Sequence, residues 1–479
     1  MGQRAYIDFK LYLTPAPDEQ GACQVALLPT PEVGETVVPV TAPIEERPPG
    51  NLLALLASKQ ITLRDLITVG KKLANCLIPE GVIRERFRYA YDRAGLEGGV
   101  RLRIIIADHG LKQWPWEYTY LNLTEGPDDM AGFLAHNARV SLVRHEPLPH
   151  PHPVLEKGAA DVKDLRLAIA AALPVGERDL DLDKEVADIK EAVHGFDVEG
   201  VRITPAPVLM DATPEDITKL PQDTYIFHFL GHGVVGERRD RTQRGGFTRP
   251  DGALLLVKDK VSKEQARLRA TDLAAILQQR GVRLALLGAC HTGHRDARYP
   301  WDDVAGAMTA AEIPTVIAMQ YEVKDAEAIA FSRAFYTALA LGQSLDEAVW
   351  SGRVGMLLET STEMDEVVNV EWGVPVLYSR LRDGALFPER IERATAAAEQ
   401  FRKVVVQTVD GIHAGTMTGV QVGLIENGVK IVQKVKEVRG HITGIKAGEA
   451  GAGANILVEQ EFETVGPDGV VCGGTFDVL

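Results

Sequence analysis

A histidine and a cysteine each follow a largely apolar run of this sequence, at the point where the run meets a glycine. The run 225–230 leads to His232, and the run 284–287 leads to Cys290. Such runs, rich in Leu, Ile and Phe and bounded by Gly, are typical of strands buried on both faces of a parallel sheet. Ligands of open α/β sheets bind outside the carboxyl ends of the strands. We therefore expect His232 and Cys290 to meet at one edge, where the histidine takes the thiol proton and the thiolate attacks a carbonyl carbon.

Other interpretations of these residues stay open at this stage. A histidine between two glycines also suits a surface loop, and a cysteine after an apolar strand is often only a small hydrophobic residue. His228 lies inside the first run, which is more typical of a core histidine. A metal site is a further alternative because residues of ligand type gather here, namely His228, His232, Cys290, His291 and His294. In a strand, however, His228 and His232 would be about 13 Å apart, and the spacing matches no standard zinc motif, so we predict no metal.

The length and composition of the chain narrow its class. Its 479 residues are enough for two or three domains, and a hydrophobic content of 45% is ordinary for a globular protein. The formal net charge of −15 argues against nucleic-acid binding, which usually shows a basic face. The sequence contains neither an apolar run that would form a membrane span nor a signal-peptide core. The 4 cysteines are scattered without a CxxC pair, which indicates a reduced, cytoplasmic protein, and we predict no cofactor.

Changes in the sequence pattern divide the chain into three parts. Residues 1–150 combine alternating strands near the N-terminus with helices, and a Pro- and His-rich linker follows at about 145–162. Residues 160–388 alternate strands with helices, which predicts a doubly wound, mostly parallel sheet flanked by helices on both faces. In this part we expect strands at 165–170, 201–203, 225–230, 282–288 and 315–319, and helices at 182–193, 214–220, 271–280, 304–312 and 326–341.

Residues 390–479 differ from the preceding part in composition and in the pattern of apolar residues. A helix is expected at 392–403, and a β-prone tail rich in Val and Gly follows it. In this tail, 415–423 resembles 440–448, and each copy is preceded by a Val- and Gln-containing run. Regular glycines between alternating residues indicate tight turns in a small sheet or a solenoid-like module. Two copies are too few to predict a true solenoid, and we expect a regulatory or recruitment module.

Several ordered motifs resemble the CHAT domain, a caspase- and separase-like branch of the clan CD cysteine peptidases. They include the Gly-His-Gly end at 231–233, the Ala-Cys-x-Thr-Gly end at 289–293, and Trp114-Pro115-Trp116-Glu117, which is similar to the family's Leu-Pro-Trp-Glu with Trp114 in place of Leu. Further markers are Ala318-Met319-Gln320, Phe331, Phe335-Tyr336, Gly342, Ala348, Arg353 and the closing strand Trp372–Tyr378. The resemblance covers roughly residues 50–387 and leaves the tail from 390 outside.

The resemblance implies an α/β, caspase-like fold in which residues 1–150 form the pseudo-caspase-like half and residues 160–388 the catalytic half. It makes His232 and Cys290 the catalytic dyad. It also assigns the oxyanion hole to the backbone N–H groups of Gly233 and Cys290, where a glycine suits close approach to the developing charge. The dyad would form a thioester and then hydrolyse it, with His232 acting first as base and then as acid. No third member can be named, and this clan often uses a backbone carbonyl to orient the histidine.

Two groups of residues are candidates for the substrate pocket. Gln320, Tyr321 and Glu322 follow the strand 315–319 and would form its wall. Asp302 and Asp303 would instead accept a basic side chain, although Asp302 also suits a helix N-cap. The loop after His232 carries five arginines, which either form a solvated loop or dock an acidic substrate or partner: Arg238, Arg239, Arg241, Arg244 and Arg249.

The sequence thus predicts a cytoplasmic, bacterial-type CHAT cysteine endopeptidase that cleaves a protein substrate. Its regulation by a protein partner and its place in a defence or cell-death system follow from the resemblance alone. Activation would order the loops 236–251 and 293–303. The alternative is a catalytically silent adaptor that binds partners through the tail, and the intact motifs around His232 and Cys290 argue against it.

Overall fold

A computed structural model describes most of the chain. The described residues are 4–16, 22–30, 33, 40–43, 61–106, 108–123, 126–145, 164–194, 202–238, 249–291, 300–321, 323–359, 368–381 and the strands between 403 and 478. Within these ranges, no helix has the length and apolar character that crossing a membrane requires.

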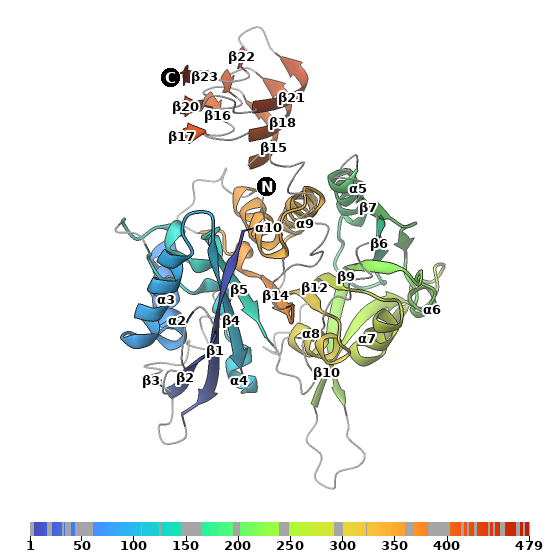
Figure 1. Ribbon diagram of the computed structural model, residues 1–479. Coiled ribbons are helices and arrows are strands. Elements are labelled where there is room, and N and C mark those ends of the chain that lie inside the picture. The colour runs from blue at the N-terminus through green and yellow to red at the C-terminus, as the bar shows by residue number, and fades with distance from the viewer. Residues whose placement is uncertain are drawn as a thin grey trace.

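One large sheet runs through residues 6–379 (Figure 1). Its main path runs in the order β11-β10-β9-β12-β13-β14-β5-β4-β1-β2-β3; off this path, β6 pairs with β9, and β7 and β8 pair with β6. The strands of the half that contains His232 are β6 (Asp164–Ala171), β7 (Arg202–Pro205), β8 (Leu209–Met210), β9 (Thr224–Arg238), β10 (Arg249–Val257), β11 (Gln265–Arg269), β12 (Leu284–His291) and β13 (Thr315–Met319). Strands β6, β9, β12 and β13 are parallel, as the alternation of strands and helices predicts.

Helices cover both faces of this half. Side chains at alternate positions of β9 enter two separate cores: Ile226 and Leu230 join one, and Phe227 and Phe229 the other. The first core includes residues of α5 (Leu182–Val193), α9 (Asp325–Ala340) and α10 (Leu345–Glu359). The second includes residues of α6 (Pro214–Thr218), α7 (Ala270–Gln279) and α8 (Pro300–Ala310). The sheet is therefore doubly wound and mixed but largely parallel, which confirms the predicted fold class.

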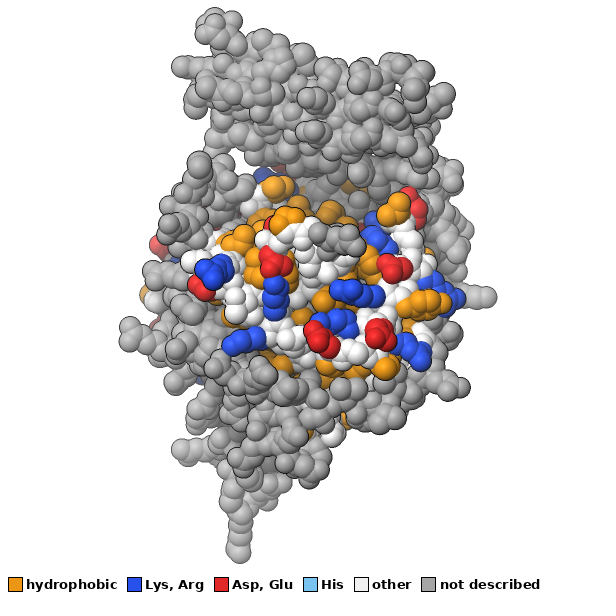
Figure 2. Space-filling view, turned by 90° about the vertical axis from the view of Figure 1, so that its left-hand side faces the viewer, with side chains coloured by type: hydrophobic (Ala, Val, Ile, Leu, Met, Phe, Trp, Pro, Cys, Tyr) orange, Lys and Arg blue, Asp and Glu red, His pale blue; other side chains and the backbone are white. Residues whose placement is uncertain are grey.

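The N-terminal half extends the same sheet. Its strands are β1 (Tyr6–Pro15), β2 (Ala22–Leu28), β3 (Val40–Pro43), β4 (Gly99–Ile106) and β5 (Val140–Arg144), and its longer helices are α2 (Leu63–Leu77) and α3 (Val82–Arg93). Strand β14 (Pro375–Ser379) lies between the two halves and pairs with β13 and with β5. A buried ion pair of 2.6 Å between Arg101 of β4 and Asp346 of α10 joins the two halves. Over α2 and α3, Lys and Arg side chains alternate with Asp and Glu (Figure 2), a mixed surface typical of a solvated face.

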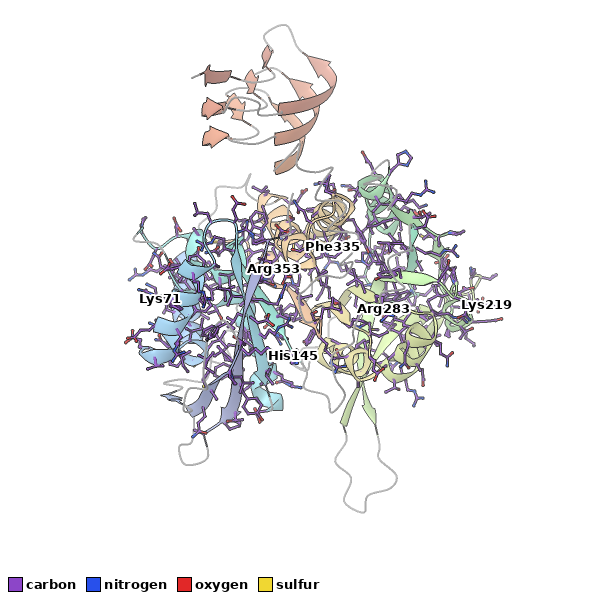
Figure 3. The ribbon with its side chains drawn as sticks, viewed as in Figure 1. Lys71, His145, Lys219, Arg283, Phe335 and Arg353 are labelled. Carbon is purple, nitrogen blue, oxygen red and sulfur yellow. The ribbon has the colours of Figure 1, made fainter. Side chains whose placement is uncertain are left out.

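An aromatic ring and a guanidinium group are both buried where the two halves meet. Phe335 of α9 is 0% exposed and Arg353 of α10 is 3% exposed. Both lie between the two halves, whereas Lys71 and Lys219 lie near opposite ends of the sheet (Figure 3). The Arg353 guanidinium donates to the carbonyl of Pro375 at 2.8 Å, which ties α10 to β14.

The described strands between 403 and 478 form a parallel β-solenoid. The first of its three-stranded sheets contains β15 (Lys403–Ile412), β18 (Val429–Val438) and β21 (Ile456–Val465). The second contains β16 (Thr416–Thr418), β19 (His441–Thr443) and β22 (Val470–Cys472), and the third β17 (Gln421–Ile425), β20 (Lys446–Ala450) and β23 (Thr475–Val478). The chain passes through each sheet once per turn, so the described strands make three turns.

The expectation of only two copies in the tail was wrong. The sequence echo connects the first and second turns, where Thr416 pairs with His441 at an offset of 25 residues. The third turn is displaced because its connections are longer, and His441 pairs with Val470 at an offset of 29 residues. The helix expected at 392–403 lies outside the described residues apart from Lys403, which begins β15.

Candidate active site

The parallel pairing of β9 with β12 places His232 and Cys290 side by side in the backbone. The two strands are parallel and adjacent, and His232 is the register partner of Cys290. Adjacent strands lie about 4.8 Å apart, and register partners of a parallel pair share a face of the sheet. Strands β9 and β12 therefore place His232 and Cys290 on the same face of the sheet at neighbouring positions.

Gly231 marks the point where β9 changes its neighbour. Residues 224–230 pair with β6, and residues 232–238 pair with β10 on the same side of the strand. At the change, Gly231 has a φ of 153°, a conformation that L side chains rarely adopt. A Cβ atom at this position would lie 2.6 Å from the carbonyl oxygen of Ala172. Only glycine fits the point at which the strand passes the end of β6 and presents His232.

A backbone carbonyl holds the imidazole of His232. The ring is buried, and its Nε2 lies 2.9 Å from the carbonyl oxygen of Arg178 in the loop between β6 and α5. A carbonyl oxygen only accepts hydrogen bonds, so Nε2 carries the hydrogen and Nδ1 is the basic atom of the neutral ring. Sequence reasoning named no third member of the site, because a backbone carbonyl leaves no residue type to detect.

The loop that carries Arg178 is attached at several points. Near its start, the N–H of Ala172 donates to the carbonyl of Leu230 at 3.0 Å, and the N–H of Val175 donates to the carbonyl of Lys263 at 2.9 Å. At its end, Asp181 caps α5 by accepting from the N–H of Lys184 at 3.1 Å. These bonds fix the position of the carbonyl that orients His232.

His228 is a core residue, as its position inside the apolar run suggests. Its ring is 0% exposed, and its Nδ1 lies 3.1 Å from the hydroxyl of Tyr336 on α9. Burial lowers the pKa of His228 to about 3, which keeps the ring neutral. No cluster of three or more possible metal ligands occurs among the residues that the structure describes.

A buried carboxyl group lies where α5 packs on α9. The Ser332 hydroxyl donates to Glu185 Oε1 at 2.8 Å across this contact. Burial raises the pKa of Glu185 to about 7, and the neighbouring carboxylates of Asp325 and Asp188 act in the same direction. Sequence reasoning missed this group, because a helix pattern does not show that one of its carboxyl groups is covered.

The residues predicted for the substrate pocket lie in different environments, and Gln320 is the one described most fully. Gln320 is buried, and its amide donates to Glu117 Oε2 at 2.9 Å and to the carbonyl of Gly373 at 3.0 Å. Its Oε1 accepts from Arg144 at 3.1 Å, beside the Arg144–Glu117 ion pair of 2.6 Å. The side chain of Gln320 is thus fully engaged in an interior network, and Glu117 of the Leu-Pro-Trp-Glu-like motif is the anion of that network.

The other predicted pocket residues are only partly described. Tyr321 is buried, and Glu322 lies outside the described residues. Asp302 and Asp303 lie inside α8, which begins at Pro300, so Asp302 is not the N-cap that the sequence allows. Of the arginine-rich loop, Arg238 and Arg249 are register partners in β9 and β10, and the arginines between them lie outside the described residues.

Comparisons with known proteins agree with the motifs of the sequence. The CHAT domain family model matches residues 68–397, and no curated protein matches the chain. Among solved structures, the Arg-specific cysteine proteinase gingipain R (RGPB) has 11% identity and a TM-score of 0.36 over 66% of this chain and 68% of that chain. The separase of the Saccharomyces cerevisiae separase–securin complex has 10% identity and a TM-score of 0.40 over 78% of this chain and 30% of that chain. The family match includes both segments that meet at β9 and β12, and on it the chain belongs to the CHAT domain family.

Proposed function

We propose that this protein is a cysteine endopeptidase in which Cys290 is the nucleophile and His232 the proton carrier. The observation that carries the proposal is the register of β9 and β12, which makes these two residues neighbours on one face of the sheet. The bond from His232 Nε2 to the carbonyl of Arg178 supports it, because it leaves Nδ1 as the base. Membership of the CHAT family supports the same chemistry.

In the proposed reaction, His232 Nδ1 takes the proton of the Cys290 thiol, and the thiolate attacks the carbonyl carbon of a peptide bond. The backbone N–H groups of Gly233 and Cys290 stabilise the oxyanion of the tetrahedral intermediate. The imidazolium then gives its proton to the leaving amine, and a thioester remains. Water attacks the thioester while His232 takes a proton from it, and the thiol is released with the carboxylate product. Arg178 acts through its carbonyl by holding the ring in one tautomer.

The substrate in this proposal is a protein, and a second protein regulates the enzyme. Tyr321, Glu322, Asp302 and Asp303 stay as the candidate walls of the pocket, whereas Gln320 would have to leave the Arg144–Glu117 network to contact a substrate. Ordering of the loops 236–251 and 293–303 is the proposed activation step. A cytoplasmic location and a role in bacterial defence or cell death complete the hypothesis and rest on the family resemblance and on the pattern of cysteines.

Selective alkylation tests the dyad. We expect limiting iodoacetamide at pH 7 to modify Cys290 first, and His232→Ala to slow that modification by about tenfold or more because the thiolate fraction falls. His194→Ala, at the exposed C-cap of α5, is the matched control and should leave the rate unchanged. The buried thiols of Cys23 and Cys76 should stay unmodified.

A peptide library then separates the enzyme from the silent adaptor. Cleavage that disappears in Cys290→Ala supports the peptidase. Rapid labelling of Cys290 without cleavage of any peptide or partner favours the adaptor. A Cys290 that reacts no faster than the thiol of a free peptide, with or without a partner, would refute the dyad itself.

A further inference from the structure

The solenoid stacks chemically related residues at equal positions of its turns. In the sheet of the long strands, Gln407 is the register partner of Gln433, and Gln433 is the partner of Gln460. The positions on either side of this glutamine row differ in charge from turn to turn. Because the three glutamines occupy the same register position, the other residues of the three strands can be compared by their distance from this row.

Three of the four even-numbered positions from 430 to 436 in the middle strand are basic, and acidic residues recur at alternate positions of the third strand. In β18 they are Lys430, Lys434 and Lys436, and in β21 they are Glu459, Glu461 and Glu463. Residues two apart lie on the same face of a strand, so each set shares one face. Lys434 is the register partner of Glu461, which pairs opposite charges across the two strands.

The acidic strand lies at the edge of its sheet. β21 pairs with β18 on one side, and none of the described strands pairs with it on the other. An edge strand presents a row of backbone N–H and C=O groups that a further strand can satisfy. Its side-chain positions then decide which strand is accepted, because like charges directly opposite each other are unfavourable.

The two arrangements that a second copy of this chain would make give the glutamates of β21 no basic partner. Pairing of β21 with another β21 in register sets the row of glutamates against itself. Pairing of β21 with the free edge of β15 sets Glu459 and Glu461 level with Val406 and Thr408, and neither of these is basic. A strand with the pattern of β18 instead satisfies the backbone, continues the glutamine row and places lysines level with Glu461 and Glu463.

We propose that the edge of β21 with which none of the described strands pairs is a docking site for a β-strand of a partner protein, with an amide side chain level with Gln460 and Lys or Arg level with Glu461 and Glu463. The partner strand extends the solenoid by one strand of a further turn. This site is independent of the peptidase chemistry, since none of its residues belongs to β9 or β12.

A peptide copied from the chain itself is the probe. A fluorescent peptide with the sequence of residues 429–438 (VKIVQKVKEV) is titrated against the full-length chain and followed by anisotropy. A control peptide carries Glu in place of its three lysines. We expect the lysine peptide to bind about tenfold or more tightly than the glutamate peptide, because the two positions level with Glu461 and Glu463 change from attraction to repulsion. Raising the ionic strength should reduce this preference.

Two variants locate the binding. The triple variant Glu459→Gln, Glu461→Gln, Glu463→Gln should lose most of the preference, and a variant with Glu97→Gln, Asp183→Asn and Glu191→Gln at exposed sites elsewhere controls for net charge. Circular dichroism and the rate of Cys290 alkylation verify that both variants are folded. Equal binding of the two peptides, or unchanged binding by the triple variant, overturns the proposal. If no peptide binds and the triple variant self-associates, the glutamates serve only to prevent pairing between the strand edges of two copies. This result would also overturn the proposal.

Discussion

Replacing Glu185 by glutamine should stabilise the protein above neutral pH and leave it unchanged in acid. The ordinary pKa of this carboxyl group is 4.5 and burial raises it to about 7. When the folded pKa lies above the unfolded one, ionisation opposes folding, so stability falls as pH rises from 4.5 towards 7. A difference of about 2.5 pKa units at 1.36 kcal/mol per unit corresponds to about 3 kcal/mol at pH 8. Glutamine keeps an oxygen that accepts from the Ser332 hydroxyl, so the variant loses the charge and retains the bond.

Urea denaturation followed by tryptophan fluorescence at several pH values between 5 and 8 measures the effect. The difference in midpoint between Glu185→Gln and the parent should grow with pH and level off above about pH 8. Glu191→Gln removes an exposed carboxylate from the same helix and serves as the control, with a small difference that does not grow. A difference for Glu185→Gln that is constant with pH, or that shrinks as pH rises, would contradict the reasoning.

Three further substitutions probe the frame of the site. Gly231→Ala should destabilise the protein by about 1–3 kcal/mol and slow alkylation of Cys290. The backbone φ at this position is unfavourable for a residue with a side chain, and the added Cβ atom would collide with a backbone carbonyl. A normal rate of alkylation would speak against this explanation. Glu117→Ala should cost about 3–5 kcal/mol since it leaves Arg144 buried without its carboxylate, and a shift in melting temperature shows it. Tyr336→Phe should cost only about 1 kcal/mol by losing the bond to His228, with no change in alkylation; a large change in alkylation would assign His228 to the site.

The elements of the half that contains His232 were predictable from the sequence because local pattern decides them. Apolar runs and the helices between them identify β9, β12 and β13, and their parallel order follows from the alternation. The exact end of β9 was not predictable in this way. A glycine normally weakens a strand, so the run was taken to end at Gly231, whereas the strand continues to Arg238 by gaining β10 as a new neighbour.

The parts that sequence reasoning missed depend on contacts between distant segments. The carbonyl of Arg178 and the interior bonds of Gln320 involve partners separated by 54 and by 203 residues. The periodicity of apolar residues along the sequence carries no information about pairs this far apart. The third turn of the solenoid was missed for another reason: its longer connections break the repeat offset, although the strand positions themselves recur.

The change of neighbour at Gly231 has a mechanical consequence for control of the site. His232 has a strand partner on each side, Cys290 of β12 and Leu255 of β10, so it sits within a ladder and not at the tip of a loop. A residue that is paired on both sides belongs to the rigid part of the sheet, so we do not expect a regulator to act by moving it. Of the two segments proposed to be ordered on activation, we therefore expect 293–303, on the cysteine side of the pair, to control the proposed peptidase. Amide exchange at His232 should accordingly be as slow before activation as after it.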